Sequence, residues 1–141
     1  MRFILDTNIL LSALIKDSIT RKIIIQSEWN FYYPEMSFHE VRKYKELVLK
    51  KSGMSETEYH KLLNLLLKKI NIVPDERIMN YLEEAKKIMV LIDPDDVIFV
   101  ATKFSIPDSI IWSDDTDFDK QLEVKVFKSA IIINLFKSLN E

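Results

Sequence analysis

Short apolar runs alternate with longer segments of helical periodicity along the whole chain. Apolar runs of strand length occupy 3–5, 29–33, 70–73, 110–112 and 124–127. Between these runs, apolar residues recur at spacings of three and four positions, which is typical of amphipathic helices. Helices are expected over 9–14, 19–26, 37–51, 55–69, 75–89, 93–104 and 130–139. Because strands that alternate with helices indicate crossover connections, the pattern predicts an α/β fold with three α/β/α layers around a central, mostly parallel five-stranded sheet.

Polar residues mark where several of these helices begin and end. Ser37 and Glu40 have the spacing of a capping box, and so do Ser55 and Glu58. Gly53 lies between the two helices and suits the left-handed position that ends the first one. We expect 37–69 to form a helical arm within a single domain that covers 1–141.

Composition excludes several kinds of site. The chain of 141 residues has one glycine, so it contains neither a glycine-rich phosphate loop nor a G-x-S-x-G nucleophile elbow. It has no cysteine, which excludes disulfides, thiolate metal sites and cysteine nucleophiles. No apolar run reaches the roughly 20 residues of a membrane span, and Asp6 comes too early for a secretory leader. We therefore expect a cytoplasmic protein with no membrane partner.

Acidic residues are concentrated in one part of the chain. Segment 93–119 holds eight aspartates and one lysine, a formal charge of −7, which leaves +5 for the rest of a chain whose total is −2. Two acid-rich turns that happen to be neighbours would explain this pattern. It also suits a cation site beside a surface that binds a polyanion.

Four acids are placed where an α/β sheet binds its ligands. Such sheets bind ligands beyond the carboxyl ends of their strands, and Asp6 and Asp115 follow the apolar runs 3–5 and 110–112. Asp96 and Glu40 lie in the first turns of predicted helices, which begin on the same edge of the sheet. We expect all four carboxylates to converge in one cleft.

Each acid also has a purely structural explanation. Asp6 could cap the first helix, Glu40 could complete a capping box, and Asp96 could complement a helix dipole. A fully buried strand that ends in a carboxylate is the hardest of these to explain structurally, because that acid must be solvated, paired or bound to metal. An EF-hand is excluded, because Lys120 and Val126 occupy the positions where its loop needs Gly and Glu.

Converging carboxylates have a characteristic chemistry. They repel one another when ionised, so several stay charged in one cleft only if a cation compensates. Ligands that are all oxygen atoms favour Mg²⁺ or Mn²⁺. Such a site activates water and offsets negative charge at phosphorus, which is the chemistry of phosphodiester hydrolysis.

The acids and their neighbours together resemble a PIN domain. The resemblance rests on the order Leu5-Asp6-Thr7-Asn8, then Glu40, then Asp96 followed by Ala101, then Ser113-Asp114-Asp115-Thr116-Asp117-Phe118, and it covers essentially the whole chain. It implies a five-stranded α/β/α fold and Mg²⁺- or Mn²⁺-dependent cleavage of RNA. It also implies that Asp6, Glu40, Asp96 and Asp115 are the catalytic acids, that Ser113 steadies Asp6, and that Asn8 braces the site.

We assign metal contacts to Asp6, Asp96, Asp115 and Asp117. Two choices stay open: Asp114 or Asp117 could replace Asp115 as the fourth acid, and Asp93 or Asp95 competes with Asp96. The resemblance further implies an RNA substrate and, as in the toxin halves of toxin–antitoxin pairs, an antitoxin partner and a homodimer. Basic residues of the arm are expected to contact RNA phosphates: Arg42, Lys43 and Lys45.

Three alternatives remain. A HAD-like phosphohydrolase also has an aspartate after its first strand, but it needs D-x-D there and Asn8 takes the second position. A phospho-receiver domain needs its acceptor aspartate after the third strand, where Pro74 stands. From another class, a catalytically silent module with this fold would bind protein or RNA and need not bind Mn²⁺.

Overall fold

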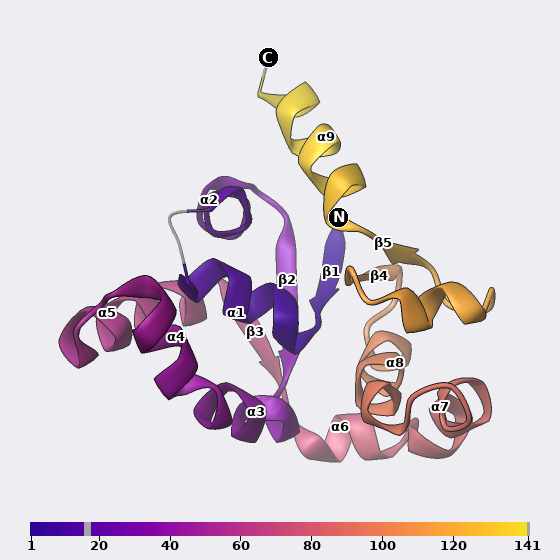
Figure 1. Ribbon diagram of the computed structural model, residues 1–141. Helices are drawn as coiled ribbons and strands as arrows, with labels where there is room; N and C mark the ends of the chain where they lie inside the picture. Colours follow the sequence, from indigo (N-terminus) through magenta and orange to yellow (C-terminus); the bar gives the residue numbers. More distant parts are fainter. Residues whose placement is uncertain (16–17, 141) are drawn as a thin grey trace.

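The computed structural model describes residues 1–15 and 18–140. A parallel sheet lies at its centre (Figure 1). Its strands are β1 (Arg2–Leu5), β2 (Asn30–Pro34), β3 (Ile70–Val73), β4 (Ser109–Trp112) and β5 (Val126–Phe127). The strand order is β3-β2-β1-β4-β5, and every neighbouring pair is parallel. The predicted five-stranded α/β fold is confirmed, although the last strand is shorter than the predicted 124–127.

Helices fill the connections between these strands. The α-helices are α1 (Thr7–Ile15), α2 (Ile19–Gln26), α3 (Phe38–Lys43), α4 (Lys45–Ser52), α5 (Glu56–Leu67), α6 (Asp75–Met79), α7 (Leu82–Met89), α8 (Val97–Ser105) and α9 (Ser129–Leu139). In the part of the chain that the structure describes, the short 3₁₀ helices are η1 (Glu35–Ser37), η2 (Pro94–Asp96) and η3 (Thr116–Lys120).

The strand order places the helices on both faces of the sheet. Connections between parallel strands are right-handed, so a chain that moves from β1 through β2 to β3 and then returns to β4 covers opposite faces on the two legs. On one face α8 contacts β1, β2 and β4, and α6 and α7 pack against α8. On the other face α1 contacts α2, α4 and α5, while α9 contacts α2.

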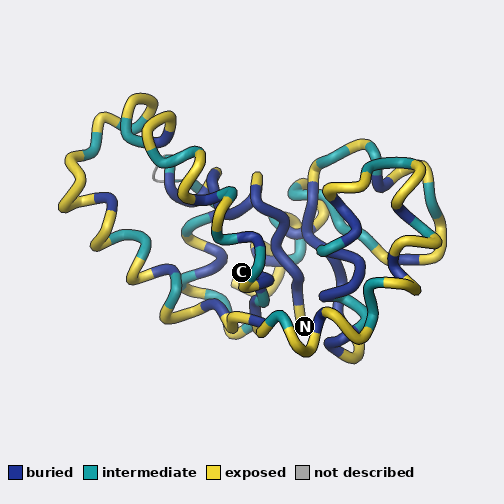
Figure 2. Tube along the Cα trace, turned by 90° about the horizontal axis from the view of Figure 1, so that it is seen from below, coloured by how far each residue is buried: buried dark blue, intermediate teal, exposed yellow. Residues whose placement is uncertain are grey.

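The two central strands lie in the most buried part of the molecule. Phe3, Ile4 and Leu5 of β1 are fully buried, and all four residues of β4 are buried. Strands of a parallel sheet with helices on both faces are expected to be apolar throughout. In Figure 2 buried stretches run through the middle of the trace and exposed segments lie along its outside.

Several predicted elements differ in detail. The continuous helix predicted over 37–51 is wrong: η1, α3 and α4 replace it, and Tyr44 (φ −96°, ψ 7°) interrupts the last two. The helix predicted over 75–89 is interrupted before α7, at Tyr81 (φ −116°, ψ 3°). The loop predicted over 113–119 contains η3. Within the described residues, no helix has both the length and the apolar character needed to cross a bilayer.

The sheet reverses its direction of growth between β1 and β4. The chain adds β2 and β3 on one side of β1, and β4 and β5 on the other. Ligands of open parallel sheets bind at such a switch point, beyond the carboxyl ends of the strands. Asp6 directly follows β1 and Ser113 directly follows β4 at this position. The Asp6 N–H donates to the Trp112 carbonyl (3.3 Å).

Candidate metal centre

Asp6 is a buried acid that two hydrogen bonds hold in place. Only 5% of the residue is exposed. Its Oδ1 accepts from the N–H of Ile9 (2.9 Å), which caps α1, and its Oδ2 accepts from the buried hydroxyl of Ser113. Burial raises the pKa of Asp6 to about 6 despite these hydrogen bonds, and the negative charges of Asp115 and Asp114 raise it further. Asp6 therefore caps α1, as one prediction had it, and also occupies the position predicted for a functional acid.

Asp96 is buried with an unsatisfied oxygen. The turn that carries it is set by Asp93, whose Oδ1 accepts from the Asp95 N–H (3.0 Å), and by Pro94 at the start of η2. Asp96 is 7% exposed, and its Oδ2 has no hydrogen-bond partner among the described residues. Burial raises the pKa of Asp96 to about 8, with further contributions from the charges of Asp93 and Asp115. An orphaned carboxylate oxygen of this kind needs a proton or a cation.

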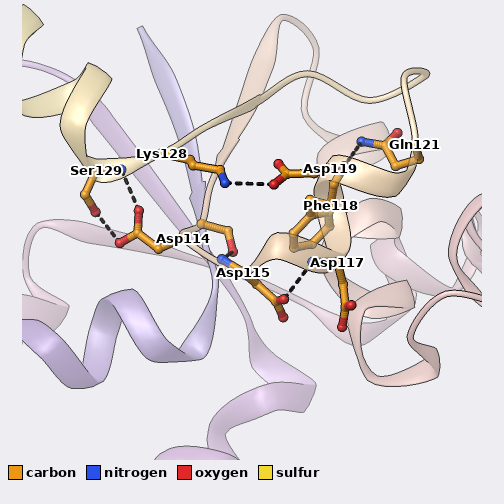
Figure 3. A network of polar contacts seen from close by, with 9 residues as sticks. Asp114, Asp115, Asp117, Phe118, Asp119, Gln121, Lys128 and Ser129 are labelled. Atoms are coloured by element: carbon orange, nitrogen blue, oxygen red, sulfur yellow. Dashed lines mark hydrogen bonds and ion pairs between the residues drawn. The ribbon is translucent and has the colours of Figure 1, made fainter.

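The four aspartates after β4 separate into different roles. Figure 3 shows the Asp114 side chain directed toward Ser129, while the carboxylates of Asp115 and Asp117 point to the other side. Asp114 accepts from the Ser129 N–H (2.8 Å) and hydroxyl (2.6 Å) at the start of α9. Asp115 accepts from the Asp117 N–H (2.9 Å) and so caps η3. Asp114 thus supports α9, whereas Asp115 and Asp117 point away from it.

Glu40 is held by a residue from another helix. Thr7 Oγ1 donates to Glu40 Oε1 (3.2 Å), and the Tyr33 hydroxyl lies 2.8 Å from Thr7 Oγ1 and donates to the Ser37 carbonyl (3.0 Å). Burial raises the pKa of Tyr33 well above its usual value, so it remains a proton donor. Thr7 and Tyr33 have one hydroxyl proton each, so two protons are shared among these three contacts. This chain from Tyr33 through Thr7 fixes one oxygen of Glu40.

The capping box predicted for Ser37 and Glu40 is wrong. Ser37 makes no side-chain cap bond, and its buried hydroxyl has no partner among the described residues. Ser37 is the last residue of η1 and has a turn conformation (φ −96°, ψ 1°). It therefore lacks the extended backbone that an N-cap residue typically has. The same motif at Ser55 and Glu58 forms both reciprocal bonds, each 3.2 Å long.

The predicted catalytic acids line one cleft. A cavity of about 160 Å³ is lined by Asp6, Thr7, Asn8, Glu40, Tyr44, Asp93, Asp95, Asp96, Phe99 and Asp115. It contains all four acids of the predicted catalytic set together with Asn8, and among the described residues its lining includes no lysine or arginine. Ser113 does not line the cleft, but its hydroxyl donates to Asp6 and accepts from the Asp115 N–H (3.1 Å), and both of these residues do. The geometry thus brings together residues from the ends of β1 and β4 and from the starts of α3 and α8.

One cluster within this region has the spacing of a metal site. Asp93, Asp96, Asp115 and Asp117 each offer a carboxylate oxygen, and the four oxygens lie within 4.8 Å of one another. Asp93 was not in the predicted metal set, and nothing in the sequence favours it over Asp95. Asp6, which was in that set, lies outside this four-atom group but lines the same cleft. Asp117 also pairs with Lys120 (2.9 Å), which lowers its pKa.

The residues present suit a hard divalent cation. All donors are carboxylates, as Mg²⁺ and Mn²⁺ prefer. Asp96 Oδ2 is buried without a partner among the described residues, and burial, together with repulsion from neighbouring aspartates, holds the pKa values of Asp6 and Asp96 above their usual range. A bound cation would remove both penalties at once.

The basic residues of the arm differ in their positions. Lys43 lines a second cavity beside the cleft. Lys45 contacts α5 instead, where its Nζ lies 3.5 Å from Glu56 and 5.8 Å from the Tyr59 ring centre. Arg42 is exposed and contributes to the lining of neither cavity. Of the three predicted RNA contacts, only Lys43 adjoins the acids.

Fold and site together define an α/β protein with a cluster of carboxylates at the switch point of a parallel sheet. The model of the PIN domain family matches residues 4–126, and the chain belongs to this family. Its members are in general metal-dependent nucleases. No curated protein matches the chain significantly.

Proposed function

We propose that this chain is an endoribonuclease that hydrolyses RNA phosphodiester bonds with Mg²⁺ or Mn²⁺. The observation that carries the proposal is the partnerless buried oxygen of Asp96, one of four aspartate oxygens within 4.8 Å of each other in a PIN domain. The HAD-like alternative lacks the second aspartate of its motif, and the family match does not support it.

Asp96, Asp115 and Asp117, with Asp93, would hold the cation, and Asp6 would face it across the cleft. A divalent ion in such a place lowers the pKa of water and offsets the charge that develops on phosphate oxygens. The chain itself prepares the acids. Ser113 and the Ile9 N–H fix both oxygens of Asp6, so this carboxylate keeps one orientation as substrate enters.

Glu40 is suited to accept a proton from the attacking water. Thr7 occupies Oε1 (3.2 Å), which leaves Oε2 for the water on the cleft side. Asn8 is exposed at the rim, where its amide can donate to a phosphate oxygen. Because the lining lacks a basic side chain, a phosphate is repelled until its charge is compensated. RNA should therefore bind more tightly with the divalent ion than in EDTA.

Cleavage of a single-stranded RNA in Mn²⁺, Mg²⁺ and EDTA tests this proposal. Cleavage with either metal and none in EDTA is expected, and Asp96→Asn should abolish it. Asp119→Asn is the matched control, because Asp119 is exposed and pairs with Lys128 (2.8 Å) outside the cleft. Undiminished cleavage in EDTA would contradict the proposal, and a protein that binds no Mn²⁺ would favour the silent module.

We also propose that the chain acts as the toxin half of a toxin–antitoxin pair, as a cytoplasmic homodimer. Support comes from the family and from apolar side chains on the arm: Leu47 of α4 and Leu65 of α5 are each 44% exposed. Light scattering should give twice the chain mass of 16.7 kDa. Induced expression without a partner should arrest growth of a bacterial host, and Asp96→Asn should relieve the arrest.

A further inference from the structure

A second cavity adjoins the acidic cleft. It measures about 270 Å³ and lies between α3 and the beginning of α8. It shares three lining residues with the cleft, namely Glu40, Tyr44 and Asp95. A ligand whose phosphate lies in the cleft can therefore extend into this second cavity and stay in contact with the protein.

Its lining differs from that of the cleft. Lys43 adds a positive charge, and Pro94 and Ile98 add apolar surface. Tyr44 is half-buried at the boundary between the two cavities, where the interruption between α3 and α4 places it. The Lys43 ammonium lies 5.4 Å from the centre of the Tyr44 ring. An aromatic face beside a cation is the combination with which proteins bind single-stranded nucleic acid.

His39 adds a polar group of defined orientation to the wall. Its Nδ1 lies 2.8 Å from the Met36 carbonyl. Because a carbonyl can only accept, Nδ1 must carry the proton, and Nε2 remains for a partner at the cavity. The cavity thus offers an aromatic face, a cation and a hydrogen-bonding group, which match the base, phosphate and base edge of one nucleotide.

We infer that this cavity, here called the flanking pocket, binds the unpaired nucleotide next to the cleaved phosphate. Its base packs on Tyr44 and Ile98, and its own phosphate contacts Lys43. The base must be unpaired, because a base within a duplex has both faces stacked and its pairing edge occupied. The inference rests on the proposed nuclease function and names the part of the substrate that the chain recognises beside the acids.

A double-mutant cycle between protein and RNA tests the inference. One abasic nucleotide is placed at successive positions of a short single-stranded RNA, and each RNA is measured with wild type, Tyr44→Ala and Tyr44→Phe. KM is measured with Mn²⁺, and Kd is measured by fluorescence anisotropy in EDTA, where cleavage is not expected. Removal of the base adjacent to the cleaved phosphate should weaken wild-type binding about 10-fold. The same removal should have little further effect in Tyr44→Ala, and Tyr44→Phe should behave as wild type.

Lys43 allows an independent cycle should Tyr44→Ala fail to fold. A neutral methylphosphonate linkage at the flanking position should weaken wild-type binding and leave Lys43→Gln unaffected. Lys51→Gln is the matched control, because Lys51 is an exposed lysine near the end of α4 that lines neither cavity. If the RNA change and the protein change weaken binding independently at every position, so that their effects on Kd multiply, the inference is overturned. If wild type does not cleave at all, the nuclease proposal fails, while the anisotropy cycles still decide whether the pocket binds a nucleotide.

Discussion

Asp96 and Asp114 are both aspartates at the carboxyl edge of the sheet, yet their surroundings are opposite. Asp114 is exposed, and its two oxygens accept from the N–H and hydroxyl of Ser129. Asp96 is buried, leaves one oxygen without a partner among the described residues, and faces Asp93 and Asp115. The first acid has the contacts that stabilise a helix end, whereas the second is held in place although burial, and then repulsion from its neighbours, disfavours its charge. This difference separates acids that support the fold from acids positioned for a cation.

The largest expected effect is on cleavage. Asp96→Asn should lower kcat/KM by about 100-fold or more, because loss of a metal ligand should exceed the 10- to 100-fold loss typical of residues that merely orient ligands. Asp114→Asn keeps an acceptor oxygen for Ser129 and should retain most of the activity. Rates in saturating Mn²⁺ and melting temperatures are measured for both variants. Equal losses of activity would remove the distinction between the two acids.

The second effect is on stability as a function of pH without metal. The pKa values of Asp6 and Asp96 rise from 3.8 to about 6 and about 8 on folding. The folded state therefore binds these protons more tightly than the unfolded state. The contribution is fully present below about pH 4 and is lost as pH rises through about 6 and about 8, at up to about 1.4 kcal/mol per pH unit for each acid.

Urea unfolding in EDTA at a series of pH values measures this loss. Asp96→Asn should remove the whole Asp96 contribution, which alone still changes between about pH 6 and 8, so its stability relative to wild type should increase with pH. Mn²⁺ should stabilise wild type most at high pH, where the carboxylates are ionised. A wild-type free energy of unfolding that increases between pH 5 and 8 in EDTA would contradict the raised pKa values of Asp6 and Asp96.

A smaller effect is expected at the residue that holds Glu40. Thr7→Val keeps the shape of the side chain but removes the hydroxyl that donates to Glu40, and Tyr33 keeps its bond to the Ser37 carbonyl. Loss of one hydrogen bond to a charged group corresponds to about a 10-fold lower kcat. Thr7→Ser should restore the rate, and Mn²⁺ affinity should not change. Full activity in Thr7→Val would show that Glu40 needs no such support.

The smallest effect is expected at an exposed ion pair near the cleft. Lys128→Gln breaks the 2.8 Å contact with Asp119, in which both side chains are about half exposed. Exposed pairs contribute little, so the free energy of unfolding should fall by less than about 1 kcal/mol and cleavage should not change. Melting curves and cleavage rates at 0.1 M and 1 M salt provide the measurement. A large loss of activity would extend the functional site beyond the described cleft.

The sequence predicted the strands and the approximate place of the acids well. Runs such as Phe3-Ile4-Leu5 are too short and too apolar to be anything but buried strands between helices, and their carboxyl ends must share one edge. The interruptions at Tyr44 and Tyr81 were missed because neither place has the Gly or Pro that signals a break, and tertiary packing overrides local preference.

Local motifs alone could not decide how side chains pair. Ser37-x-x-Glu40 and Ser55-x-x-Glu58 share one spacing, but only the second forms a capping box. Glu40 instead contacts Thr7, a residue 33 positions away that no local pattern reveals. The choice among Asp93, Asp95 and Asp96 likewise depends on the fold, because all three line the cleft and only Asp95 lies outside the group of four close carboxylates. The cytoplasmic location and the dimer remain predictions.

The central claim is that the aspartate cluster binds a divalent cation through the buried oxygen of Asp96. A crystal structure with Mn²⁺, with the ion located by its anomalous scattering, tests this most directly. We predict an ion in contact with Asp96 Oδ2 and with carboxylate oxygens of Asp115 and of Asp93 or Asp117. No anomalous peak at millimolar Mn²⁺ near neutral pH, or a peak that does not touch Asp96, would contradict it.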